Sequence, residues 1–351
     1  MKKTIKEFDE CLEIAKKSSS QSKPSILLGN GFSMELNKSI FSYSALQKVA
    51  IESLEGTDKE KLEELFKNAN TQDFEIILKK IRDAIEITKI ICASDSSTLR
   101  SLEKTYEMVK QCLIKTISKC HPDKPNDIDD WRYDSCQRFI ANFDTIYTIN
   151  YDLTLYWALM HNYDKENSDN NFIKHYPDGF TNPSTTEDYV IWDIKRGKSP
   201  SLIYLHGALH IFDDDGIIKK FTWNRSGRSL KSQITDQLER NTFPIFISEG
   251  TTSDKKARIN GSSILSKGYR SLSNKGGNLF TFGISFSDND DHLLEAIFNS
   301  HVKNLFIGVY GGNIDTNLSN KIQRSVSQLQ APGKTPPQIH YYNTCTAKAW
   351  G

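Results

Sequence analysis

The sequence predicts an α/β protein built on a Rossmann-like, doubly wound parallel sheet that carries a large helical insertion. Short apolar stretches alternate with helical stretches along most of the chain, which is typical of a parallel sheet covered by helices on both faces. A long stretch between the first two strands repeats apolar residues at three- and four-residue steps, as amphipathic helices do. Several apolar stretches end directly in glycine, asparagine or histidine, at the strand ends where such sheets bind ligands.

The elements follow one another in a regular order. The expected strands are 25–28, 145–149, 189–192, 202–205, 243–247, 279–282, 305–309 and 338–342. Helices are expected at 4–18, over most of 43–120 with one start near Thr71, and at 131–142, 153–160 and 290–299, the last capped by Asp288 or Asp290. This order divides the chain into an N-terminal helix (1–24), a Rossmann domain (25–44 and 143–351) and a helical insertion (45–142).

Composition limits the classes of protein to consider. The chain has 351 residues, 37% hydrophobic and 25% charged, with a net charge of +1, which is ordinary for a globular protein. The near-neutral balance argues against direct nucleic-acid binding. No apolar run reaches the roughly 18 residues that span a bilayer, and no signal peptide is visible, so we expect a cytoplasmic protein without membrane partners. The six cysteines form no CxxC pair, so we expect reduced thiols and no metal site.

Polar residues follow four of the predicted strands directly. These sites are Gly29-Asn30-Gly31-Phe32-Ser33, Asn150-Tyr151-Asp152, His206-Gly207 and Gly283-Ile284-Ser285. Because the carboxyl ends of parallel strands meet at one edge of the sheet, we expect the four sites to surround a single crevice.

Each site has a chemical interpretation and an ordinary structural one. The glycine turn offers backbone N–H groups to a phosphate, and His206 is a candidate general base. Asn150 can hold a water or a ribose hydroxyl, Asp152 can accept from a carboxamide, and Ser285 can bind a ribose or a phosphate. The structural alternatives are a common strand-to-helix turn at the first site and a helix cap by Asn150 or Asp152 at the second. They are a histidine bonded to nearby backbone at the third site and a turn followed by a helix cap at the fourth.

In this order the four sites resemble the motifs of the sirtuin-like superfamily. The Thr148-Ile149-Asn150-Tyr151-Asp152 form is similar to bacterial sirtuin-like NADases of anti-phage defence. The Gly-Asn-Gly-Phe-Ser start, the Phe41-Ser42-Tyr43 stretch that follows and the long helical insert resemble a bacterial branch near the abortive-infection proteins. The resemblance implies NAD as the substrate and an NAD glycohydrolase that acts in abortive infection. Its implied catalytic residues are Asn150, His206 and Asp152. The implied NAD-binding residues are Gly29, Asn30, Gly31, Phe32, Ser33, Phe41, Gly283, Ser285 and Asp288.

The resemblance also implies partners and leaves alternatives open. It implies a homo-oligomer and a HerA-type ATPase or another defence partner. The zinc-ribbon cysteines of sirtuin deacylases are missing, which favours NAD cleavage over deacylation. A protein deacylase, an ADP-ribosyltransferase and a non-catalytic sensor of NAD or ADP-ribose are the alternative functions.

Overall fold

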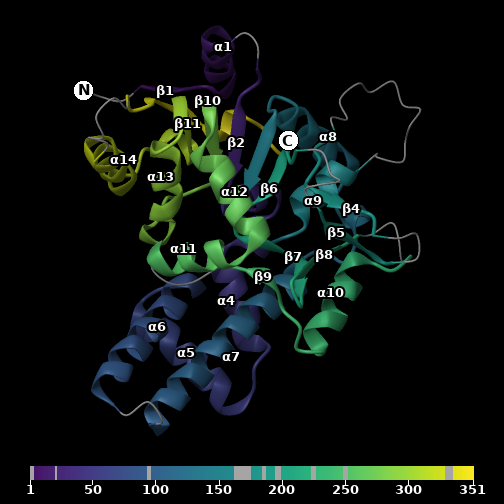
Figure 1. Ribbon diagram of the computed structural model, residues 1–351, viewed down its shortest axis with the longest axis vertical. Helices are drawn as coiled ribbons and strands as arrows, with labels where there is room; N and C mark the ends of the chain where they lie inside the picture. Colours follow the sequence, from purple (N-terminus) through teal and green to yellow (C-terminus); the bar gives the residue numbers. More distant parts are fainter. Residues whose placement is uncertain are drawn as a thin grey trace.

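The computed structural model describes residues 4–19, 22–92, 96–161, 175–183, 187–193, 199–222, 227–247, 252–328 and 335–351. Its centre is a seven-stranded parallel sheet in the order β1-β12-β11-β10-β2-β3-β6 (Figure 1). These strands are β1 (Ile5–Lys6), β2 (Ser25–Leu28), β3 (Thr145–Thr148), β6 (Leu202–Tyr204), β10 (Gly276–Phe282), β11 (His301–Val309) and β12 (Gln338–Asn343). The predicted fold class, a doubly wound parallel sheet, is confirmed.

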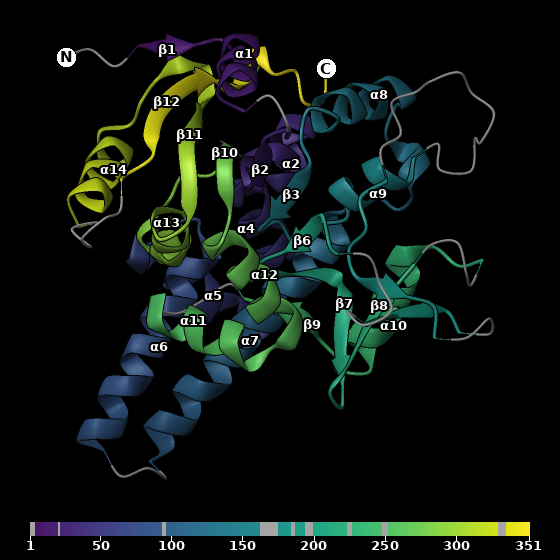
Figure 2. The ribbon, with the colours of Figure 1, turned by 45° about the horizontal axis from the view of Figure 1, so that its top comes forward.

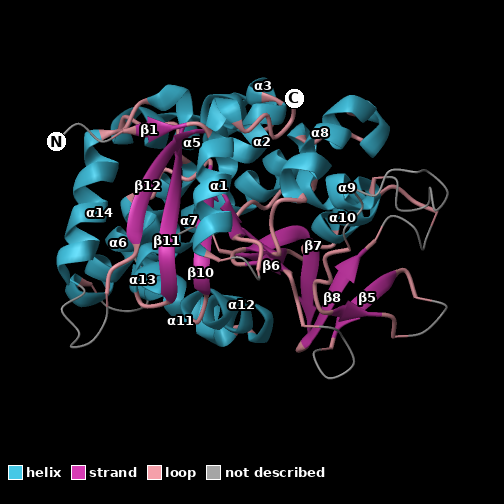
Figure 3. Ribbon diagram, turned by 90° about the horizontal axis from the view of Figure 1, so that it is seen from above, coloured by secondary structure: helices cyan, strands magenta, loops and turns pink. Residues whose placement is uncertain are grey.

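Alternate residues of the central strands face opposite helix layers, as the two-residue period of a strand requires. In β2, Ile26 and Leu28 join one apolar core and Leu27 joins the other. Figures 2 and 3 show helices on both faces of the sheet. The first core includes α1 (Phe8–Ser18), α2 (Asn30–Leu36), α8 (Asp130–Ile140) and α9 (Thr154–Met160), and the second includes α12 (Ser263–Ser273), α13 (Asp291–Phe298) and α14 (Thr316–Gln328).

A helical block lies beyond the carboxyl edge of the sheet, at the bottom of Figure 1. It consists of α4 (Tyr43–Glu52), α5 (Gly56–Ala69), α6 (Phe74–Ile91) and α7 (Ser97–Cys120), and follows the short α3 (Lys38–Phe41). Helix α6 begins after Asp73, whose side chain accepts the N–H of Glu75 at 2.8 Å, so it starts slightly later than the expected Thr71. Helix α8, which we had placed in the insertion, packs on the sheet instead, since Phe139 contacts Phe8 and Phe282.

A second, antiparallel sheet was not expected from the sequence. Its strand order is β4-β5-β8-β7-β9. The strands are β4 (Phe180–Thr181), β5 (Tyr189–Trp192), β7 (Gly207–Asp214), β8 (Ile217–Phe221) and β9 (Pro244–Phe246), and α10 (Leu230–Glu239) follows β8. We had counted 243–247 among the parallel strands, but β9 pairs antiparallel with β7. Helix α11 (Thr252–Gly261) precedes α12.

The N-terminal segment is part of the main sheet. Residues 4–18 were predicted as one helix, but Ile5 and Lys6 form β1, which pairs with Tyr341 and Tyr342 of β12. Helix α1 begins only after Glu7, whose backbone N–H donates to the Glu10 carboxylate at 2.9 Å. In the part of the chain that the structure describes, no helix is both long and apolar enough to cross a bilayer.

Candidate active site at the carboxyl edge of the parallel sheet

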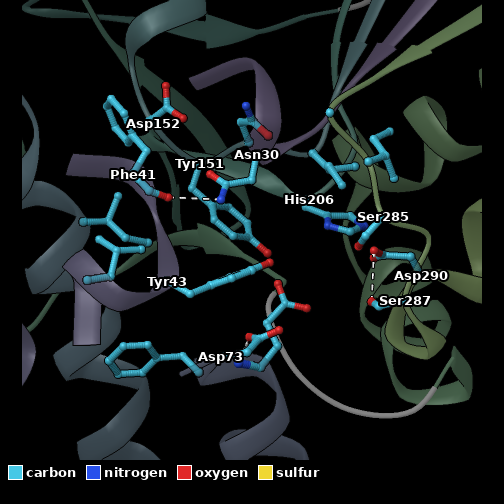
Figure 4. Close-up of a pocket in the computed structure, with 18 of the residues that line it drawn as sticks. Asn30, Phe41, Tyr43, Asp73, Tyr151, Asp152, His206, Ser285, Ser287 and Asp290 are labelled. Atoms are coloured by element: carbon cyan, nitrogen blue, oxygen red, sulfur yellow. Dashed lines mark hydrogen bonds between the residues drawn. The ribbon is translucent and has the colours of Figure 1, made fainter. Parts of the chain in front are cut away.

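One cavity lies beyond the carboxyl ends of the four neighbouring strands β10, β2, β3 and β6 (Figure 4). The space between its walls, open solvent at the mouth included, is about 910 Å³. Strands β2 and β10 meet where the strand order reverses, the switch point at which open α/β sheets bind ligands. The sheet and the helical block both line the cavity, with Asn30, Phe41, Tyr43, Leu46, Asp73, Phe74, Glu75, Leu113, Ile117, Ile149, Asn150, Tyr151, Asp152, His206, Gly283, Ile284, Ser285, Ser287 and Asp290.

The four predicted sites therefore meet at one place. The predicted residues that line the cavity are Asn30, Phe41, Asn150, Asp152, His206, Gly283 and Ser285. Asp288 lies outside it, because its exposed carboxylate pairs with Lys321 at 2.6 Å. The short 3₁₀ turn before α13 directs Asp290 to the cavity instead, where its carboxylate accepts from the Ser287 hydroxyl at 3.3 Å. Figure 4 shows this pair beside Ser285 and His206.

The side chain of Asn150 is held in one orientation. Its Nδ2 donates to the backbone oxygen of Gly29 at 3.0 Å and to the hydroxyl of Ser33 at 2.9 Å. Because a backbone carbonyl oxygen only accepts hydrogen bonds, the nitrogen must face Gly29. The amide oxygen, Oδ1, is therefore the atom of Asn150 that is left to bind a ligand in the cavity.

Asp152 holds Asn150 in place through the hydroxyl group of Ser33. Its carboxylate accepts from the Ser33 hydroxyl at 2.6 Å, and from the backbone N–H and hydroxyl of Thr154 at 2.9 and 2.5 Å. The Ser33 proton is thus directed to Asp152, which leaves the Ser33 oxygen to accept from Asn150. This chain of bonds gives Asp152 a positioning contribution that the sequence did not reveal, beside its predicted contact with a carboxamide.

The two glycine corners pack against each other. A Cβ on Gly31 would lie 2.5 Å from the Cα of Gly283, and Gly283 has a φ of +69°, so both positions require glycine. The N–H groups of Gly29, Gly31 and Phe32 donate to Phe282, Gly283 and Gly29, each at 2.9 Å. These three N–H groups, which we expected to face a phosphate, are therefore engaged within the protein. The side chain of Phe32 is buried against Phe282 and Trp350.

His206 lies at the end of β6 and is almost fully buried. Its Nε2 is 2.8 Å from Nε2 of His292, in the first turn of α13. Burial, Lys255 and His292 together hold the pKa of His206 well below its usual range, so its imidazole is neutral at physiological pH. With Nε2 held by His292, Nδ1 is the ring nitrogen left to take a proton in the cavity.

The helical block contributes a wall that the sequence did not reveal. Tyr43, Asp73 and Glu75 line the cavity from α4 and the start of α6, and Figure 4 shows Tyr43 pointing toward Tyr151 from the opposite side. Glu75 pairs with the buried Lys255 of α11 at 3.1 Å, and Asp290 lies 3.7 Å from the same ammonium group. Burial nevertheless raises the pKa of Glu75 to about 8.

We expect the free energy of unfolding to decrease as the pH falls from about 6.5 to 4. His121 supports the segment after Asn150, because its Nε2 accepts the Leu153 N–H at 3.0 Å, and burial lowers its pKa to about 4. The unfolded chain takes up this proton near pH 6.5 and the folded chain does not, so stability is full above that pH and is lost below it. The expected loss from His121 is on the order of 2 kcal/mol at about pH 5.

Urea unfolding at about pH 7.5 and 5 measures this loss in the wild type and in His121→Gln, which cannot take up the proton. His301→Gln, at an exposed position, is the control. Equal pH dependence in the wild type and His121→Gln would contradict the assignment.

Comparison with known proteins matches most of the chain to one family. Residues 26–350 match a family described as a domain of unknown function, DUF4917. No curated protein matches the chain. The matched range includes the antiparallel sheet, the helical block and the main sheet apart from β1 and the first residue of β2, and within it lie all the residues that line the cavity.

Proposed function

This chain belongs to the DUF4917 family, and for it we propose an NAD glycohydrolase activity of the sirtuin-like type that releases nicotinamide and ADP-ribose. The proposal is carried by one observation, the convergence of Asn150 and His206 on a single cavity. Gly283 and Ser285 line the same cavity from the neighbouring side of the switch point. An amide, a neutral imidazole and a glycine corner are the elements that the resemblance to sirtuin-like NADases requires.

The proposed reaction breaks the bond between the nicotinamide nitrogen and C1′ of the ribose. The bonding electron pair goes to the pyridinium ring, which leaves as neutral nicotinamide, while C1′ gains the character of an oxocarbenium ion. The oxygen of a water molecule then bonds to C1′, and one of its protons is released to a base and then to solvent. The products are nicotinamide, ADP-ribose and one proton.

Four side chains have distinct tasks in this scheme. Oδ1 of Asn150 accepts a hydrogen bond from the ribose hydroxyl or from the attacking water. Nδ1 of His206 takes the proton, as a neutral imidazole can. Asp152 holds Asn150 through the hydroxyl of Ser33 and supports the carboxamide of nicotinamide. Phe41, which lines the same cavity, is the aromatic side chain proposed to cover the nicotinamide ring.

The direct test is to incubate the purified protein with NAD and to separate the products by chromatography. We expect nicotinamide and ADP-ribose in equal amounts, with little product from His206→Gln. Product that appears only with an acyl-lysine peptide would favour a deacylase instead. Binding of NAD without turnover, both in vitro and as an unchanged NAD level in cells that express the protein, would favour the sensor alternative.

The cellular role is a separate part of the proposal. Abortive infection, self-assembly and a HerA-type ATPase partner rest on the sequence resemblance alone and stay predictions. Depletion of cellular NAD after phage infection, compared between the wild type and His206→Gln, measures the first of them.

A further inference from the structure

Two buried histidines share one proton beside the cavity. Nε2 of His206 and Nε2 of His292 are 2.8 Å apart, and their rings are nearly parallel with an interplanar angle of 21°. Their side chains are removed from solvent, with relative exposures of 2% and 0%. A nitrogen–nitrogen distance of this length needs one donor and one acceptor, because each neutral imidazole has one nitrogen of each kind.

The position of the shared proton decides what His206 can do. If the proton is on Nε2 of His206, its Nδ1 carries a lone pair and can accept a proton in the cavity. If it is on Nε2 of His292, His206 must carry its own proton on Nδ1 and can only donate there. His292 therefore controls the tautomer of His206, as a partner of one ring nitrogen fixes the protonation of the other.

We propose that His292 is a positioning residue that accepts the Nε2 proton of His206 and thereby holds Nδ1 of His206 ready as the base. This inference rests on the proposed function for its catalytic consequence, but the tautomer itself does not depend on any activity.

The surroundings of the pair support a neutral imidazole at His292. The residue lies in the first turn of α13, where the positive end of the helix dipole disfavours an imidazolium ion. The ammonium of Lys255 adds a further positive charge that acts on His206. A neutral His292 carries one lone pair, and we place it at Nε2, where it faces the Nε2 proton of His206. In addition, the Tyr269 hydroxyl donates to the backbone oxygen of His292 at 2.9 Å, which ties the first turn of α13 to α12.

The tautomer can be read directly from nitrogen chemical shifts. The full chain is labelled with ¹⁵N-histidine, and the signals of His206 are assigned by their loss in His206→Gln. We expect a protonated Nε2 and an unprotonated Nδ1 for His206 in the wild type near neutral pH. A protonated Nδ1 with an unprotonated Nε2 overturns the proposal.

Kinetics with NAD then test the catalytic consequence. His292→Leu removes the acceptor, and we expect kcat to fall about 10- to 100-fold with little change in KM and with both tautomers of His206 visible. His292→Gln can still offer a side-chain oxygen to Nε2, so we expect it to keep most of kcat and the wild-type tautomer. His301→Leu, at an exposed position, is the control for loss of a histidine.

The outcomes separate the two proposals. If the wild type shows the expected tautomer but cleaves no NAD, the proposal for the histidine pair is supported and the proposed NAD glycohydrolase activity is contradicted. If the wild type and His292→Leu cleave NAD equally fast, His292 does not position His206 for catalysis, and the proposed NAD glycohydrolase activity is supported.

Discussion

Replacement of Asn150 by alanine is expected to lower the rate of nicotinamide release from NAD by about 100-fold or more, the effect of removing a well-placed polar group from the reacting centre. The structure identifies the atom of the Asn150 side chain whose removal causes this loss of rate. Since Nδ2 is held by Gly29 and Ser33, only Oδ1 is available to orient the ribose hydroxyl or the water. Initial rates of nicotinamide formation, measured at saturating NAD, check this expectation.

Two further variants show whether the loss comes from chemistry or from folding. Ser33→Ala removes one anchor of Asn150 and leaves the bond to Gly29, so we expect a smaller loss, of about 10-fold. Asn274→Ala removes an exposed asparagine that bonds to the backbone of Arg270 far from the cavity, and we expect no loss. Turnover by Asn150→Ala close to that of the wild type, with all variants folded, would contradict the assigned part of Asn150.

Replacement of Gly207 by alanine is expected to reduce the free energy of unfolding by about 3–4 kcal/mol, from a left-handed backbone and a forced contact. Gly207 follows His206 with a φ of +84°, and a Cβ there would lie 1.9 Å from the backbone oxygen of Ile245 in β9. Relief of this contact would push β7 and β9 apart, so His206 would move and activity would fall as well. Urea unfolding measures the change in stability.

Gly216 provides a matched control for this prediction. Its φ is +85°, almost that of Gly207, but a Cβ there would meet no atom within 4 Å. Gly216→Ala should therefore show only the backbone cost of about 1 kcal/mol. Equal losses of stability in the two variants would mean that the close approach of β9 to Gly207 has no effect.

The main sheet was predictable because its signals are local. Apolar runs such as Ser25–Leu28 and Thr145–Thr148 need only their own residues to identify them, and both form the predicted strands. The second sheet was missed because two of its strands, near 189–192 and 243–247, were predicted without their antiparallel partners, and no strand was predicted where β4, β7 and β8 form. One local signal was available there. Asp215 and Gly216, both at positive φ, form a turn between two β-rich runs, and this pair of residues is typical of tight hairpins.

The residues of the candidate site were predictable where they follow the ends of strands. Asn150 and His206 come directly after strands of the sheet, and the fold places both at one cavity. His292 was missed because it lies within a helix, where nothing in the pattern marks it as a partner of His206. Tyr43 and Glu75 reach the cavity only through the docking of the helical block, which no local pattern specifies. Asp288 and Asp290 are separated by a single residue, and only the turn before α13 determines which one faces inward.

Lys255 connects the helical block to the rest of the protein through a buried ammonium group. Its ammonium group has no exposure to solvent and pairs with Glu75 of α6 and with Asp290 beside α13. Withdrawal of the helices would take Glu75 away and remove one of the two carboxyl groups that lie beside this buried cation, a loss that opposes the separation. Docking of the helical block therefore also completes the wall of the cavity, so a molecule that binds the outer helices would change the cavity without entering it.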